Sequence, residues 1–275
     1  MKTLLLASAA LTLAGGAFAG AANAQEWAGP YVGGHFGYAN IDDGDRETIQ
    51  FDTDLDGRFG DTVNTTAPAN AFSPGFCSGA ARTAVPIDGC SEEGDSVDVG
   101  LRAGYDWQFG PMVFGVVGEI GKVDIEDSVS GFSTTPASYT MTREINWNAG
   151  LRVRGGYAFD RFLVYGTAGP SYAKVESSFR TTNGANDFTG RGEDDGVWGY
   201  QAGFGGEARM TDNWTLGVEY LYSNYEDDGY RVRASQGTAP ATNPFILVDP
   251  AGTDFRRSDS DLSFHTIRAT VTYRF

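Results

Sequence analysis

Apolar and polar residues alternate along much of the chain, and this alternation predicts β-strands. In the clearest segment, every second residue from Val97 to Phe109 is apolar, and the residues between them are polar or glycine. Because successive side chains of a strand point to opposite faces, this segment has one apolar and one polar face. Further segments with the same period of two are 31–38, 112–123, 145–159, 162–175, 197–210, 214–223 and 266–275.

The last of these segments shows the pattern that we use to interpret the others. Tyr273 and Phe275 lie on its apolar face, whereas Arg268 and Arg274 lie on the opposite face. Such a strand suits a position between lipid and the polar interior of a barrel, although a strand of a soluble sandwich has the same alternation. Two segments deviate: the phase of the third slips near Lys122, and 162–175 is moderately apolar on both faces.

The connections between the segments alternate strictly between short and long. Short turns follow the second, fourth and sixth segments, and the long connections are 40–96, 124–144, 176–196 and 224–261. All long loops then leave from one side, as in bacterial outer-membrane barrels with short periplasmic turns and long extracellular loops. We therefore predict an all-β fold, an eight-stranded antiparallel up-and-down transmembrane β-barrel. Ten strands are the alternative, because 230–235 also alternates; we interpret that piece as an extension above the membrane.

Residues 1–24 have the features of a cleaved signal peptide. Lys2 precedes an apolar stretch, and residues 22–24 (Ala-Asn-Ala) form an A-x-A site, so we expect cleavage between Ala24 and Gln25. An uncleaved anchor helix is the alternative, but the apolar run is short for a span of ~20 residues. We expect residues 25–275 to form one barrel domain.

The composition of the expected mature chain restricts its partners. Without Lys2 it has 19 basic and 36 acidic residues, a net charge of −17, which argues against nucleic acid as a partner. The many glycines (38) and aromatic residues suit curved strands with aromatic girdles. Cys77 and Cys90 lie in one hydrophilic segment, and in an exported chain we expect them to form a disulfide. Metal binding by the two thiols is the weaker alternative.

Short motifs in the predicted strands resemble a known family. They are WAGPYVGG (27–34), VGLRAGYDW (99–107), VFGVVGEIG (113–121), LRVRGGY (151–157), GGEAR (205–209), LGVEY (216–220) and the terminal YRF. The chain resembles the small eight-stranded outer-membrane barrels of the opacity and porin-like surface-antigen family, akin to the membrane domain of outer membrane protein A. The resemblance covers every predicted strand and almost none of the loops.

The resemblance implies a place in the outer membrane of a Gram-negative bacterium, among its lipids and lipopolysaccharide. It also implies that the barrel-assembly machinery recognises the last strand through Tyr273 and Phe275. The expected role is structural and at the surface. We expect no periplasmic domain after the barrel, and therefore no attachment to the cell wall.

Charged residues are predicted to face the barrel interior. Charges in a narrow barrel are costly unless they are paired, so we expect an ion-pair network that plugs the lumen. A water-filled conducting path is the alternative, although eight strands leave barely more room than the side chains fill. We expect Arg268 to pair with Glu119, Glu207 or Glu219. The full inward set is Arg102, Asp106, Glu119, Arg152, Arg154, Glu207, Arg209, Glu219 and Arg268.

The first long loop contains the start of a calcium-loop pattern, D-T-D-L-D-G. Asp52, Asp54 and Asp56 supply oxygens at alternate positions, and Asp61 lies nearby. The full motif has a glutamate at its twelfth position, where this chain has Val63. A solvated acidic loop is the simpler interpretation, and we expect no cofactor.

The sequence also contains features that suggest an enzyme or a binding protein. Asp261, Ser263 and His265 share a strand face, but same-face neighbours lie ~6.8 Å apart, too far for a serine and its base, so a lipid-modifying enzyme is a distant alternative. Long loops rich in aromatic residues suggest contact with host or phage surfaces, so an adhesin is a further distant alternative. We therefore expect a surface-exposed structural barrel that supports envelope integrity and loop-mediated interaction, with passive diffusion of small solutes as the alternative.

Overall fold

The computed structural model describes residues 27–41, 47–91, 96–192, 194–227 and 229–275, so the predicted cleavage site lies outside the described residues. Long antiparallel strands form a closed ring in which each pairs with its neighbours along the chain, and the last pairs with the first. The ring strands are β1 (Gly29–Ile41), β4 (Ser96–Phe109), β5 (Met112–Ser133), β6 (Ala137–Phe159), β7 (Phe162–Thr181), β9 (Asp194–Arg209), β10 (Trp214–Glu226) and β13 (Asp261–Arg274). The described part of the chain contains only two short 3-10 helices, and neither has the length or apolar content of a membrane-crossing helix.

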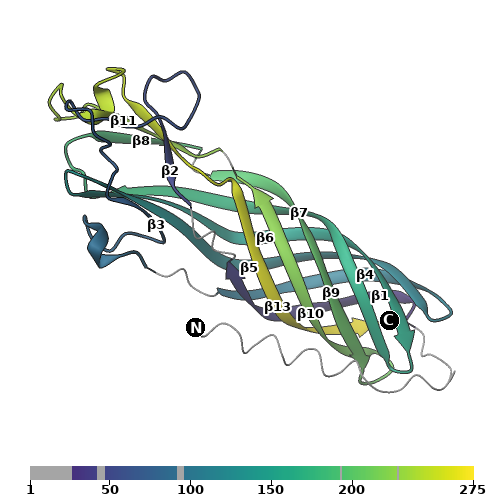
Figure 1. Ribbon diagram of the computed structural model, residues 1–275. Helices are drawn as coiled ribbons and strands as arrows, with labels where there is room; N and C mark the ends of the chain where they lie inside the picture. Colours follow the sequence, from purple (N-terminus) through teal and green to yellow (C-terminus); the bar gives the residue numbers. More distant parts are fainter. Residues whose placement is uncertain (1–26, 42–46, 92–95, 193, 228) are drawn as a thin grey trace.

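The short turns lie together at the end of the barrel that also holds the C-terminus (Figure 1). The β4–β5 turn contains Gly110 at φ 60°, and the β6–β7 turn contains Asp160 at φ 53°. Tight two-residue hairpins need this left-handed conformation, which glycine, asparagine and aspartate adopt most readily. The turn residues therefore match the positions that the sequence pattern assigned to them.

The strands β5 and β6 extend far beyond their predicted ends. They continue to Ser133 and from Ala137, so most of the expected loop 124–144 is a hairpin rather than a loop. The pairing of β5 with β6 shifts register between Lys122 and Ile125, where the sequence pattern slips. Directly above that point Val123 and Ile125 face inward and Asp124 and Glu126 face outward, whereas directly below it Glu119 faces inward and Ile120 faces outward. This inversion explains why a single apolar face ends at Lys122 although the strand continues.

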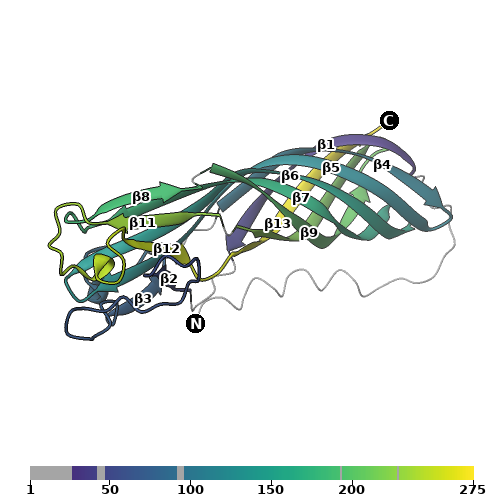
Figure 2. The same ribbon diagram turned by 90° about the horizontal axis from the view of Figure 1, so that it is seen from above.

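The other long connections fold into a head at the end of the barrel opposite the short turns (Figure 2). A second, four-stranded sheet has the order β2-β12-β11-β8, and β3 pairs with the extension of β5. Segment 230–235, expected as a strand extension, therefore belongs mainly to a separate sheet. The elements of the head are β2 (Ile49–Asp52), β3 (Gly75–Ser78), η1 (Pro86–Asp88), β8 (Asp187–Arg191), β11 (Arg231–Ser235), η2 (Pro244–Ile246) and β12 (Thr253–Arg257).

The head has an apolar core of its own, built from segments of all the long connections. Phe72 packs against Phe51 and Tyr139, with ring centroids 4.4 and 5.2 Å apart. Phe255 and Phe245 join the same cluster, which lies on the extended part of the β5–β6 hairpin. This aromatic packing requires the long connections to fold together rather than to stand as separate solvated loops.

Large apolar side chains cover the outside of the ring. Leu101 is 69% exposed and Phe36 is 64% exposed, values that a water-facing surface rarely shows over a continuous belt. The belt includes Val32, Val99, Phe114, Ile120, Leu151, Val153, Phe204, Val218 and Ile267. Aromatic residues mark both of its edges, with Trp147, Trp198 and Tyr200 toward the head and Phe109, Phe159 and Phe275 toward the short turns. A closed ring with such a belt matches the hydrocarbon layer of a bilayer.

Candidate functional site

The barrel interior is filled by layers of side chains of different character. The layer nearest the short turns is apolar and consists of Trp27, Val113, Ala158, Leu163 and Tyr165. Two layers of ion pairs follow, and a second apolar layer lies beneath the head. Together these layers determine whether the interior offers a path for solutes.

The lower ion-pair layer is a four-membered arrangement of two arginines and two carboxylates. Arg154 contacts Asp106 at 2.9 Å and Glu207 at 2.7 Å. Arg274 contacts the same two carboxylates at 2.8 and 3.3 Å. Both guanidinium groups also lie over the ring of Tyr31, 5.2 and 4.7 Å from its centroid. Every charge in this layer therefore has two partners of opposite sign.

The upper ion-pair layer is centred on Arg152 and Glu119. Two nitrogens of Arg152 bind the two oxygens of Glu119 at 2.6 and 2.7 Å. Glu219 receives Arg152 at 3.3 Å and Arg102 at 3.2 Å, and Arg268 binds Glu119 at 2.8 Å. Charge-assisted and bidentate bonds of this kind hold planar groups in a defined orientation.

Neutral and acidic side chains complete the upper layer. Asp98 lies 3.3 Å from Arg268 and 3.3 Å from Nε2 of His35. Gln201 accepts a hydrogen bond from Arg152 at 2.7 Å, and Tyr165 donates one to Glu219 at 2.8 Å. Across the two layers, five guanidinium groups face five carboxylates, with side-chain exposures between 0% and 5%. Charge is therefore balanced within the barrel.

The structure brings together eight of the nine inward residues that the sequence predicted. Arg268 takes Glu119 as its nearest carboxylate, with Glu219 at 3.9 Å, whereas Glu207 belongs to the lower layer. The ninth residue, Arg209, lies at the turn end, where it donates to the carbonyl of Asp212 and lies 5.9 Å from the ring centroid of Trp27.

Asp98, Arg274, His35 and Gln201 also face the barrel interior, although the predicted inward set does not include them. Each of them lies on the polar face of its alternating segment, and this position is the sequence signal that could have identified them. Only the register of the closed ring shows which of these side chains meet.

An apolar cap lies above the ion pairs. It includes Val123, Ile125, Ile145, Val175 and Phe264, all buried. The same cluster contains Ala39, Ile41, Ala173, Val197, Tyr225 and Leu262. These residues come from seven of the ring strands, so the cap extends across the lumen. Buried apolar side chains that pack closely together leave little space for water.

A second group of charges joins the head to the barrel, and we call it the clamp. Asp127 of β5 binds Arg143 of β6 at 2.6 Å and Arg257 of β12 at 2.8 Å. Arg257 also binds Glu47, and Arg143 donates to the carbonyl of Asp261 at 2.6 Å. Burial acts to raise the pKa of Asp127, but the guanidinium groups of Arg257 and Arg143 outweigh it and hold that pKa below its ordinary value. Burial raises the pKa of Glu47 despite the opposing effect of Arg257.

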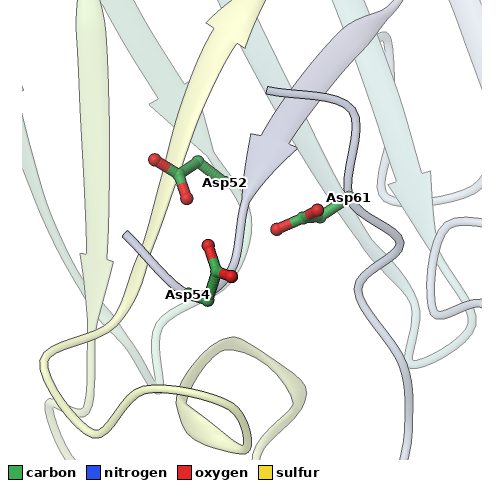
Figure 3. Close-up of side chains that lie close together, drawn as sticks. All are labelled: Asp52, Asp54 and Asp61. Carbon is green, nitrogen blue, oxygen red and sulfur yellow. The ribbon is translucent and has the colours of Figure 1, made fainter. Parts of the chain in front are cut away.

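The proposed calcium residues are brought together in part (Figure 3). Carboxylate oxygens of Asp52, Asp54 and Asp61 lie within 4.8 Å of one another. Asp61 already accepts hydrogen bonds from both the amide and the hydroxyl of Thr53, at 2.8 and 2.9 Å. Asp56 lies outside this group and pairs with Arg58. The calcium interpretation stays an untested prediction, and we assign no metal to this cluster.

The remaining candidates lie in the head and at the outer end of β13. Cys77 of β3 and Cys90 are joined by a disulfide, as the sequence predicts. His265 receives or donates a hydrogen bond at 2.6 Å to the hydroxyl of Tyr220, and its ring stacks on that tyrosine. Ser263 precedes His265 by two residues on the same strand. Same-face neighbours at this separation are too far apart for a serine–histidine pair.

Comparisons with known proteins agree with the fold. A family model described as "Outer membrane protein beta-barrel domain" matches residues 9–275. The 31 kDa outer-membrane immunogenic protein of Brucella melitensis is 29% identical over 178 residues, which cover 64% of this chain and 65% of that relative. This chain therefore spans just under two thirds of that relative's length.

Two further similarities are with a relative and a solved structure. The 22 kDa outer membrane protein of Rhizobium leguminosarum bv. viciae is 33% identical over 127 residues, or 46% of this chain and 52% of that protein. The crystal structure of the outer membrane protein OprG from Pseudomonas aeruginosa superimposes with a TM-score of 0.48 at 12% identity, covering 90% of this chain and 97% of that one.

Proposed function

Because the chain belongs to the outer membrane β-barrel domain family and lies in the outer membrane, we propose that it is a non-conducting barrel that anchors a folded head at the cell surface. The short turns then face the periplasm and the head faces outward, as in bacterial barrels of this type. The biological role is structural and surface-exposed. The proposal has two parts, a plugged barrel and a displayed head.

The observation that carries the first part is the layered filling of the barrel. A solute would have to cross two apolar layers and two layers of buried, charge-balanced ion pairs. Breaking such a pair without replacing its partner is strongly unfavourable, so the network does not open easily. Passive diffusion, the alternative expected from the sequence, needs a hydrated path that this packing disfavours.

The second part of the proposal concerns the head. Its core of packed aromatic rings and its clamp to β5 and β6 support a defined outer surface rather than a set of separate loops. Relatives of the chain are named as outer-membrane immunogenic proteins. Recognition by antibodies is expected of a protein whose outer part is exposed at the cell surface. We infer that surface contacts, with antibodies or host and phage molecules, are made by this head, and that the protein has no enzymatic activity.

Planar-bilayer recording of the refolded protein tests the first part directly. We expect no steady open channel, with heat-modifiable gel mobility as the control that the barrel has folded. A persistent conductance in preparations that pass this control would contradict the plugged barrel. The second part is tested by binding antibodies against the head to intact cells. Signal from intact cells is expected, and signal only after the outer membrane is permeabilised would contradict the orientation.

A further inference from the structure

Lys122 and Lys174 are the only lysines in the sequence apart from Lys2, and they lie in one row on the outside of the barrel. Lys122 of β5 is paired in register with Trp147 of β6, and Trp147 is paired in turn with Lys174 of β7. Neighbouring strands lie ~4.8 Å apart, so the two lysine Cα atoms flank Trp147 at a separation of about 10 Å. Two cationic side chains therefore stand on either side of one exposed indole.

The row lies at the outer edge of the apolar belt. Below it on β5 the outward residue is Ile120, which is 55% exposed. Above it the outward residues are Asp124 on β5 and Glu176 on β7. Inside the barrel, Val123 next to Lys122 belongs to the apolar cap. At this height the outward face changes from apolar to charged, and the inward face changes from charged to apolar. This change marks the boundary between the hydrocarbon layer and the lipid headgroups.

Aromatic rings extend the row along the same boundary. The ring centroids of Trp147 and Tyr172 are 5.8 Å apart, and those of Tyr172 and Trp198 are 5.3 Å apart. Amphipathic rings of this kind settle at the headgroup level, where one part packs on apolar chains and another meets polar groups. The lysines thus adjoin a continuous surface that suits the junction between an acyl chain and its headgroup.

Each lysine already has a neighbouring carboxylate, yet neither pair is closed to solvent. Nζ of Lys122 lies 3.0 Å from Asp124, and Nζ of Lys174 lies 3.1 Å from Glu176. The two lysine side chains are 65% and 39% exposed. Exposed ion pairs of this kind are weak, so each ammonium group can exchange its carboxylate partner for an anion of higher charge.

We propose that Lys122, Lys174 and Trp147 form a binding site for a phosphate-bearing glycolipid of the outer leaflet. The ammonium groups pair with a headgroup phosphate held over Trp147, while Tyr172 and Trp198 pack beside its sugar and acyl chains. The carboxylates of Asp124 and Glu176 immediately above the row disfavour an acidic protein approaching from the head side. A lipid phosphate at the edge of the belt reaches the lysines from below and avoids those carboxylates.

The test measures lipid retention by the full-length refolded protein in detergent, using native mass spectrometry. The probes are diphosphoryl lipid A and the same lipid with both phosphates removed. We expect the phosphorylated lipid to bind about tenfold more tightly, since each lysine near an anionic headgroup contributes favourably to binding. The Lys122→Gln/Lys174→Gln variant should lose this preference, whereas Lys122→Arg/Lys174→Arg should retain it.

Two controls separate this site from general electrostatics. Arg58→Gln removes an exposed cation that also pairs with a nearby carboxylate, but in the head, and should leave lipid retention unchanged. Excess inorganic phosphate should not displace the lipid, because the aromatic surface contributes to binding. The proposal is overturned if the double glutamine variant, shown to be folded by its heat-modifiable mobility, keeps the full preference for the phosphorylated lipid. Equal loss in Arg58→Gln would also overturn it.

Discussion

Arg152 and Glu119 form a bidentate ion pair across neighbouring strands at the centre of the barrel, with N–O distances of 2.6 and 2.7 Å. Side-chain exposures of 0% and 2% exclude solvent from this pair. Because Glu119 also binds Arg268, its charge holds two guanidinium groups that come from strands far apart in the sequence. This single carboxylate therefore links β5, β6 and β13 inside the barrel.

Removing the charge of Glu119 tests how much the network stabilises the barrel. We expect Glu119→Gln to lower the free energy of unfolding by about 3–5 kcal/mol, because Arg152 and Arg268 lose a buried partner. Urea unfolding of the protein in lipid vesicles, followed by tryptophan fluorescence, measures the change. Glu176→Gln is the matched control, since it removes an exposed glutamate paired with Lys174 on a ring strand, and we expect a loss of about 0–1 kcal/mol. Equal losses of unfolding free energy in the two variants would show that burial of the Glu119 ion pairs does not increase their contribution to stability.

Breaking the clamp is expected to destabilise the head without destabilising the barrel. Asp127→Asn should weaken attachment of the head by about 3 kcal/mol, because Arg143 and Arg257 lose the buried carboxylate that they share. Hydrogen exchange should become faster in β11 and β12 while β4 and β10 stay protected. Asp124→Asn, on the same strand but exposed, should leave exchange unchanged. Uniform acceleration over all strands would contradict a role confined to the head.

The clamp also predicts a pH dependence. The pKa of Asp127 is lowered in the folded protein, so its stabilising contribution is present above about pH 4, the unfolded value, and is lost as pH falls through the folded value. The pKa of Glu47 is raised by burial, so its contribution has the opposite slope and is lost as pH rises through its folded value. Protection of β12 from exchange should therefore change little, or rise slightly, as pH is lowered toward 4, and then fall. In Asp127→Asn the fall below pH 4 should be reduced; an unchanged fall would assign it to other groups.

The disulfide is expected to stabilise the first connection locally. Cys77 and Cys90 are 13 residues apart, and closing a loop of this size contributes about 3 kcal/mol on the chain-entropy model. The Cys77→Ser/Cys90→Ser variant should be cleaved faster by protease in segment 79–91, with the barrel resistant as before. Cleavage at the wild-type rate would show that β3 is held mainly by its pairing with β5.

The aromatic end of β13 provides a test of assembly. Phe275 is 72% exposed on the outward side, and its ring lies 5.1 Å from that of Tyr273. If the assembly machinery recognises these residues, Phe275→Ala should reduce the yield of heat-modifiable barrel in cells severalfold. Phe109→Ala removes an exposed aromatic residue at the same end of the barrel and should have little effect. Equal yields from both variants would assign Phe275 to membrane anchoring alone.

The sequence by itself determined the barrel and the direction of its side chains. Alternation along a strand is a local property, so segment 97–109 and the last strand show their lipid and lumen faces without any knowledge of the fold. The same local signal explains the errors. From Lys122 to Glu126 the two faces exchange polarity, so the pattern typical of a lipid-facing strand ends there although the strand continues to Ser133.

Only the tertiary structure decided which residues meet. The register of the closed ring pairs Arg268 with Glu119 and Asp98, and it pairs Arg274 with Asp106. No local sequence pattern encodes this register. The head is a stronger case, since its contacts join short segments such as Thr48 and Ser258 that are 210 residues apart. Each segment alone is too short to bury an apolar face, and packing against the others makes the head a single folded unit.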